Sequence, residues 1–466
     1  MHPFLILAIG MVIVVGGILF LRLHAFLALI LAALVVAGIT SAEVVEQFYL
    51  AEGMGAEEAH ELADKLFVFR VTQGFGAGAA KIGILIAMAA IIGKCLLDSG
   101  AAECIVIWIR KVFGEKRTPV AFSVSAFILA IPVFFDTVFY LLMPLGKAMR
   151  LRTGKNYLLY ILAIVAGGTM AHSLVPPTPG PIYVAVELGI EIGAMMLGGL
   201  VVGIFAVTAG YAYAVWANKR WVIPLRATEE MEEAVSEGSE IRHGLPPLWL
   251  ALTPIILPVV LIAGQTLAKA NEIDSSVLKV LGDKNIALII SAVISLIMLA
   301  WVKRRSLREM AKPVDDALMS GGVIILITSA GSAFGVTLRQ TGITEALQGV
   351  LPDSHLLLLV MAFGITTIMR TAQGSATVAM ITAVGIVGPL IQGIDLAYHP
   401  VYVALAIGCG SKPISWMNDS GFWIIGRLTG MTEGETLKTV TVMLLVMGLT
   451  GLGVILLGAM FVPMTG

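Results

Sequence analysis

Four ionisable side chains interrupt strongly apolar parts of this chain: Asp136, Arg370, Lys412 and Asp419. A charge at membrane depth costs at least about 2.5–3.5 kcal/mol, so a residue that keeps one there is a functional candidate by default. A carboxylate in such surroundings is suited to carrying a proton, and the planar fork of arginine binds a carboxylate through two parallel hydrogen bonds. Together these residue types predict the movement of a proton and an organic anion.

Asp136 stands in an apolar run, Phe134-Phe135-Asp136-Thr137-Val138. It is our first candidate proton carrier, and the alternative is a cap for the helix that follows it. His172 is expected to line a cavity or relay protons, with a satisfied core histidine as the alternative. Asp419 completes the set of candidate proton-coupling residues.

Arg370 is the residue best suited to meet a substrate carboxylate. Gly374, Ser375 and Thr377 follow it and begin a helical arm whose free N–H groups also suit an anion. Two alternatives remain open: Arg370 could be a structural partner, for instance of Asp136, and the small residues could serve packing.

Two segments must be broken helices. His172–Pro181 contains four prolines, which remove backbone donors and prevent a continuous helix. Unwound backbone at membrane depth is tolerated where it is buried in protein or lines a cavity, so Thr178 becomes a candidate lining residue. The second break, Ser411–Ser420, offers further candidate substrate contacts: Lys412, Ser415 and Asn418. Lys412 could instead pair with Asp419, and Asn418-Asp419 is also a plausible N-cap for 420–429.

The elements that position these residues follow from composition. Of 466 residues, 58% are hydrophobic and only 13% are charged, whereas soluble domains carry about 25% charged residues. A soluble enzyme, a nucleic-acid-binding protein and a disordered chain are therefore excluded, and an all-α polytopic membrane protein within a lipid bilayer is predicted. The net charge of −1 implies no nucleic-acid partner, and the 3 cysteines have no metal-ligand spacing, so no metal or cofactor is expected.

The apolar stretches recur in the same order in both halves of the chain: span, span, span, hairpin, broken span, span. We predict two inverted repeats of five transmembrane helices, each with a re-entrant hairpin and a broken helix. Hydropathy alone does not decide whether a hairpin is re-entrant or forms two spans. The first repeat covers 1–216, with an inward-opening hairpin at 118–150 and a broken helix at 157–191. The second covers 246–466, with an outward-opening hairpin at 355–393 and a broken helix at 399–429.

Basic residues predict the orientation. With the amino terminus outside, most Lys and Arg residues, including Arg110, Lys111 and Arg304, fall on the inner side, as the positive-inside rule requires. The segment 217–245 is then a cytoplasmic linker, and both termini face out.

The motifs resemble those of the gluconate permease family of proton symporters. Phe134 to Phe139 followed by Pro144-Leu145 is similar to the family's F-[FY]-[ED]-x-x-F tip, and His172 to Pro181 resembles H-G-F-L-P-P-x-P-G-P. Arg370 with Gly374 to Val378 matches R-x-x-x-G-S-A-T-V. Gly408–Ser411 and Asn418–Trp423 resemble G-S-G-S and N-D-x-G-F-W. The resemblance runs nearly end to end.

This resemblance implies proton-coupled uptake of gluconate or a related sugar acid across a bacterial inner membrane. Similarity to the wider ion-transporter superfamily implies a homodimer with an elevator-like transport domain. Four positions depart from the family pattern. Asp136 stands where many members have Glu, Thr178 where well-known gluconate transporters have His, and Lys412 and Trp416 where they have an apolar residue and a His. A hydroxylated monocarboxylate is expected, and the extra cation at Lys412 would favour a more acidic substrate.

We therefore predict a secondary active transporter that takes up gluconate or a related sugar acid with protons by alternating access. A sodium-coupled carboxylate or dicarboxylate transporter is the alternative with the same architecture. A membrane-embedded enzyme using His172 with Asp136 or Asp419 is a remote alternative, since no catalytic motif such as HExxH is present.

Overall fold

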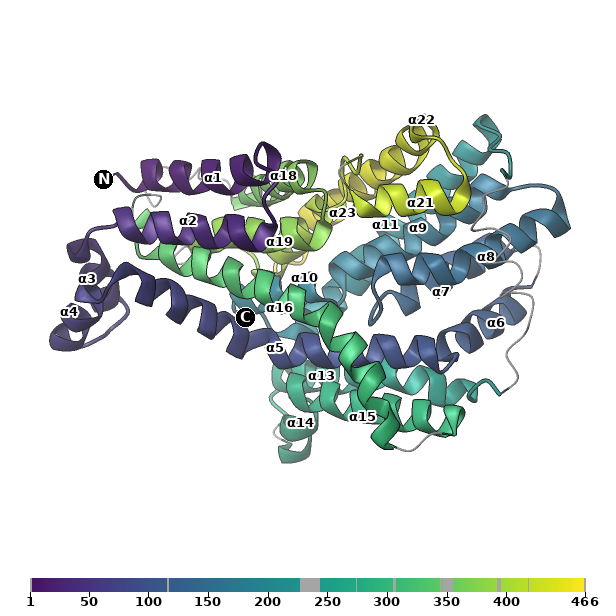
Figure 1. The fold of residues 1–466 in the computed structure, drawn as a ribbon, viewed down its shortest axis with the longest axis horizontal. Helices are drawn as coiled ribbons and strands as arrows, with labels where there is room; N and C mark the ends of the chain where they lie inside the picture. Colours follow the sequence, from purple (N-terminus) through teal and green to yellow (C-terminus); the bar gives the residue numbers. More distant parts are fainter. Residues whose placement is uncertain are drawn as a thin grey trace.

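The computed structural model describes residues 2–114, 117–226, 244–273, 275–304, 307–343, 346, 355–391, 395–417 and 419–464. Within these ranges the regular secondary structure is entirely helical, as the composition predicted (Figure 1). The prediction that 217–245 is a linker falls mostly on 227–243, outside the described residues.

The first half contains the helices α1 (Pro3–Leu19), α2 (Ala25–Ile39), α3 (Ala42–Ala51), α4 (Ala56–Asp64), α5 (Phe67–Asp98), α6 (Ala101–Phe113), α7 (Thr118–Leu129), α8 (Phe135–Thr153), α9 (Tyr157–Leu174), α10 (Pro179–Glu187) and α11 (Ile192–Arg220). The second half contains α13 (Leu248–Ala270), α14 (Ser276–Leu281), α15 (Lys284–Lys303), η2 (Leu307–Met310), α16 (Ala311–Arg339), α18 (His355–Gln373), α19 (Ala376–Ile391), α20 (Val401–Gly410), α21 (Ser420–Thr429), α22 (Glu433–Thr436), η3 (Leu437–Thr441) and α23 (Val442–Phe461).

Helix length and hydropathy make this a multi-pass membrane protein. Among the described residues, 8 helices are long and apolar enough to cross a bilayer. A ninth span is possible if α2 and α3, which meet at a 99° bend, count as one. Helices α3, α4, α6 and α14, which run for 6 to 13 residues, are each too short to cross a bilayer alone.

The packing pairs the two halves crosswise. Helices α5 and α16 lie side by side through the middle of the molecule, α2 packs on α16, and α15 packs on α5 (Figure 1). Within the halves, α7 packs on α9 in the first and α18 packs on α20 in the second, while α11 and α23, one from each half, pack on each other. An internal duplication is expected to pack in this way, and the inversion of the repeats stays a prediction.

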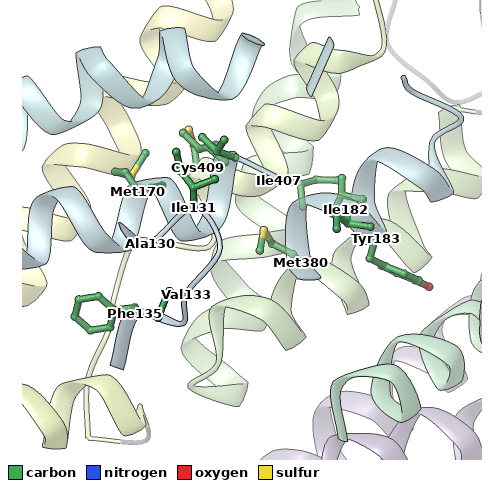
Figure 2. Close-up of a cluster of buried hydrophobic side chains, with 14 of the residues drawn as sticks. Ala130, Ile131, Val133, Phe135, Met170, Ile182, Tyr183, Met380, Ile407 and Cys409 are labelled. Carbon is green, nitrogen blue, oxygen red and sulfur yellow. The ribbon is translucent and has the colours of Figure 1, made fainter. Parts of the chain in front are cut away.

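The broken helices form the centre of the protein. Every residue of α9 is buried, and so is every residue of α20. Figure 2 shows apolar side chains gathered where the α7–α8 connection, α9, α10, α19 and α20 meet, among them Ile131, Met170, Ile182, Met380 and Cys409. Dense packing of this kind positions the unwound segments firmly.

Candidate functional site

The first hairpin places Asp136 in the first turn of α8. The connection between α7 and α8 runs from Ala130 to Phe134, and α8 begins at Phe135. No side chain makes a capping hydrogen bond at this helix start, so the alternative role of Asp136 as an N-cap is not realised. Its carboxylate is half-buried and lies near the positive end of the helix dipole.

The second hairpin turns at Gly374 and Ser375. Gly374 has φ +74°, a left-handed conformation that favours glycine, and it ends α18. Arg370 lies in the last turn of α18 with 6% of its surface exposed, and its Nη1 donates to the Gly374 carbonyl oxygen. The turn therefore holds the guanidinium at the tip, directly before the first turn of α19, which contains Thr377.

The second broken helix brings a carboxylate to that guanidinium. Asp419 is 7% exposed and caps α21, because its Oδ1 accepts a hydrogen bond of 2.9 Å from the Gly421 N–H. Its Oδ2 accepts from both Arg370 Nη2 and Ser415 Oγ. The predicted cap is thus confirmed, and the carboxylate partner of Arg370 is Asp419.

Lys412 and Ser411 connect the second break to the first broken helix. Lys412 is 4% exposed, and its Nζ donates to the carbonyl oxygen of Thr169 at 2.9 Å. Ser411 Oγ donates to Ser173 Oγ at 3.1 Å. An ammonium group has three N–H donors, and the contacts of Lys412 within the described part of the chain use one of them.

These groups surround one cavity of about 260 Å³. Eight of the predicted site residues line it, from both hairpins and both broken helices: Asp136, His172, Arg370, Ser375, Thr377, Lys412, Ser415 and Asp419. The convergence of residues that lie up to 283 positions apart in the sequence agrees with the prediction that tips and breaks form one site.

Three predicted residues are placed elsewhere. Thr178 lies at a small void between α5 and the first hairpin tip, and its hydroxyl donates to the Val175 carbonyl oxygen at 2.8 Å. Gly374 does not line the cavity and acts through its carbonyl group. Asn418 lies outside the described residues.

The cavity also contains residues that sequence reasoning missed. Thr169 and Ser411 line it, as do the apolar side chains of Ile324 and Ile327 from α16. One signal for the first two was available: the offset of 242 that pairs Gly168 with Gly410 also pairs Thr169 with Ser411. Nothing in the third span of the second half distinguishes the two isoleucines from other apolar residues.

The charges of the cavity are two cations and two carboxylates. Arg370 and Asp419 are paired, while Lys412 is held by backbone and Asp136 lies at the opposite tip. The Nε of Arg370 and the Nδ1 of His172 have no hydrogen-bond partner among the described residues, and the His172 ring lies 5.8 Å from that of Phe134. Buried polar groups normally have partners, so this arrangement has donors and acceptors to offer a polar anion. No cluster of three or more His, Cys, Asp or Glu residues suited to a metal occurs in the described part of the chain.

Comparison with known proteins agrees with this architecture. Residues 2–461 match the model of the family described as GntP family permease. An uncharacterized permease of Haemophilus influenzae is 32% identical over 444 residues, which cover 91% of this chain and 86% of that protein. A gluconate permease of Zymomonas mobilis is 31% identical over 428 residues, with 91% of this chain and 94% of that protein covered.

A solved structure shares the fold at low sequence identity. The crystal structure of the YdaH transporter of Alcanivorax borkumensis superposes with a TM-score of 0.61 at 13% identity, over 89% of this chain and 91% of that one. The family match over nearly the whole chain, the relative above 30% identity and the membrane-spanning helices lead to one conclusion: this protein is a multi-pass membrane transporter that belongs to the GntP permease family.

Proposed function

We propose that this protein takes up gluconate or a related sugar acid together with protons, by alternating access, across a bacterial inner membrane. The observation that carries the proposal is the shared cavity, in which Asp136, Arg370, Lys412 and Asp419 meet among hydroxyl groups. A sugar acid combines one carboxylate with several hydroxyls, and this set of side chains can pair with both. The relative from Zymomonas mobilis is named a gluconate permease, which supports the same substrate class.

Charge balance supports the coupling. When all four ionisable residues are charged, the two cations and two carboxylates cancel. Protonation of Asp136 leaves one net positive charge, which a monocarboxylate then neutralises. Because an uncompensated charge is costly in low-dielectric surroundings, the proton and the anion each favour binding of the other. Asp136 is accordingly the proposed proton carrier, with His172 and Asp419 as further coupling residues.

Arg370 is the proposed carboxylate anchor, together with the arm that begins at Ser375. Its Nη groups already hold Gly374 and Asp419, and the fork has five N–H donors, so a substrate carboxylate can bind without displacing both contacts. Lys412 supplies a second cation, while Ser415 and Thr377 supply hydroxyl groups for the sugar chain. The orientation with both termini outside and assembly as a homodimer belong to the same proposal.

Transport in proteoliposomes tests the coupling. We expect the unsubstituted protein to accumulate labelled gluconate when a pH gradient, acidic outside, is imposed, and to ignore a sodium gradient. Asp136→Asn should abolish accumulation against a gradient, because an amide cannot bind a proton at this site. Asp98→Asn, at an ion pair of α5 whose two side chains are each about one third exposed, is the matched control and should transport normally.

Two results would contradict the proposal. Undiminished pH-driven accumulation by Asp136→Asn would remove this residue as the carrier, and a requirement for sodium without any response to pH would favour the sodium-coupled alternative. A thermal-shift screen of sugar acids and dicarboxylates on the purified protein identifies the substrate class, since a ligand that binds the folded state raises its stability.

A further inference from the structure

A second group of charges lies outside the cavity, where α10 meets α5 and α16. Glu187, in the last turn of α10, has only 4% of its side chain exposed. Its Oε2 lies 3.9 Å from Lys81 Nζ on α5, and its Oε1 lies 3.9 Å from Arg339 Nη1 on α16. One buried carboxylate therefore connects α10 to both long helices of the α5–α16 pair.

The surface around this carboxylate makes few other polar connections. Tyr183, one turn earlier on α10, points its hydroxyl group away from the apolar cluster (Figure 2). That hydroxyl faces the Ser332 hydroxyl of α16, while Ser329 Oγ and Glu187 Oε1 have no hydrogen-bond partner among the described residues. The ion pairs of Glu187 and the facing hydroxyl groups of Tyr183 and Ser332 are the polar attachments that the described contacts show across this boundary.

Small residues let the helices approach closely here. A Cβ at Gly331 of α16 would contact Ile381 of α19 and lie 3.2 Å from the Tyr183 hydroxyl, and a Cβ at Gly335 would lie 3.6 Å from Gly385 Cα. We call this boundary, between α10 and α19 on one side and α5 and α16 on the other, the α10–α16 seam. Close approach of small residues favours packing without bulky interlocking side chains.

The seam separates the helices that carry most cavity residues from the α5–α16 pair. Helix α19 supplies Thr377 and Ile381 to the cavity, and α10 continues the broken helix that supplies Thr169 and His172. Any displacement of these elements along α5 and α16 must separate Glu187 from Lys81 and Arg339.

We propose that Glu187 is a positioning residue that ties α10 to α5 and α16 in the conformation seen here, and that transport requires this charged tie to open. The proposal rests on the alternating access proposed above. Uncharged glutamine at this position should shift the conformational equilibrium away from the present arrangement, because an interaction present in one state only biases the population of that state.

The direct test is cross-linking across the seam. Gly331 and Ile381 are each replaced by cysteine in a variant whose native cysteines are alanine. Replacing Ile381 also removes the side chain that a Cβ at position 331 would contact. Disulfide formation under fixed oxidant and pH is followed by mass spectrometry. We expect Glu187→Gln to slow cross-linking by at least roughly fivefold.

Glu191→Gln is the matched control, since Glu191 pairs with Lys269 at an exposed site next to the same helix. It should change the rate by less than about twofold, because exposed ion pairs contribute little. Cross-linking as fast in Glu187→Gln as in the background would overturn the proposal.

Stability provides a second measurement that needs no cysteine in the seam. Lys81→Gln with Arg339→Gln leaves the buried carboxylate unpaired, so the melting temperature should fall. Adding Glu187→Gln should raise it again, since the unpaired charge is then gone. A triple variant no more stable than the double variant would show that the three charges do not act together.

Substrate binding separates this proposal from the proposed function. Glu187→Gln should still be stabilised by gluconate, because Glu187 does not line the cavity. Loss of that stabilisation in Glu187→Gln alone would place Glu187 in substrate binding and overturn its role as a tie. If gluconate stabilises neither protein, the proposed substrate fails while the cross-linking result still decides the tie.

Discussion

Both broken helices are interrupted by a stretch of unwound backbone, but the side chains at the two interruptions differ. The interruption between α9 and α10 contains prolines, and within it the Thr178 hydroxyl donates a hydrogen bond to the Val175 carbonyl oxygen. The interruption between α20 and α21 carries Lys412 and Asp419, both buried and both bonded. The sequence offset of 242 pairs Lys412 with Met170, which packs in the apolar cluster of Figure 2.

This difference indicates a division of roles between the halves. The first half supplies Phe134, Phe135, Thr169, His172 and the single carboxylate Asp136, while the second half supplies both cations and the second carboxylate. A duplicated architecture can therefore place unlike groups on opposite sides of one cavity. An asymmetric ligand, charged at one end and hydroxylated along its length, suits such a cavity.

Asp419→Asn, in the second broken helix, is expected to have the largest effect on stability. It removes the charge partner of the buried Arg370, so the free energy of unfolding should fall by about 3–5 kcal/mol. Because the cavity then carries one net positive charge, gluconate should still bind and should restore part of the lost stability. Thermal unfolding with and without ligand measures both effects. A fall of less than about 1 kcal/mol would indicate that the pair stabilises little, and removal of both charges in Arg370→Met with Asp419→Asn should recover part of the loss.

The two glycines that the sequence offset pairs, Gly168 and Gly410, are expected to differ in how much stability they lose on substitution. In the second half, a Cβ at Gly410 would lie 2.5 Å from the Phe363 carbonyl oxygen, which is backbone and cannot move aside. In the first half, a Cβ at Gly168 would lie 2.9 Å from Cδ2 of the Phe135 side chain. We expect Gly410→Ala to cost about 1–3 kcal/mol and Gly168→Ala less. Equal melting temperatures for the two variants would contradict this ranking.

The smallest effects are expected for two hydroxyl residues, one that stabilises the fold and one that contacts the substrate. Thr178→Val removes one hydrogen bond, so stability should fall by about 0.5–1.5 kcal/mol while the dissociation constant for gluconate stays the same. Ser415→Ala removes a hydroxyl that lines the cavity and should raise that constant about 3- to 10-fold. Calorimetric titration of both variants decides, and weakened binding by Thr178→Val would return Thr178 to the site.

Much of this site could be predicted because turn chemistry is local. Prolines and glycines mark where the helices must stop, and the connections lie at 130–134 and 374–375, inside the predicted hairpins 118–150 and 355–393. The capping role of Asp419 was likewise readable from its place before an apolar run. The apolar arms then bring both tips and both breaks to one cavity.

Partner choice was not predictable, because it depends on long-range packing. Arg370 could have met Asp136, and instead meets Asp419, since α18 packs against α20. Lys412 meets a backbone carbonyl of α9, an acceptor that every residue offers and that no motif marks. The amphipathic helix α6 was also missed, because its last turn contains Arg110 and Lys111 and it lacks the apolar length of a span.

The complete burial of α9 has a consequence for biosynthesis. This helix has no surface left for lipid, and its neighbours include α7, α8 and α11 from its own half but also α20 and α23 from the other half. The first half emerges from the ribosome before those two helices exist, so α9 must wait with part of its surface covered by lipid or by insertion machinery. The core around α9 can close only when α20 and α23 have entered the membrane, so folding of the centre of the first half depends on helices of the second half.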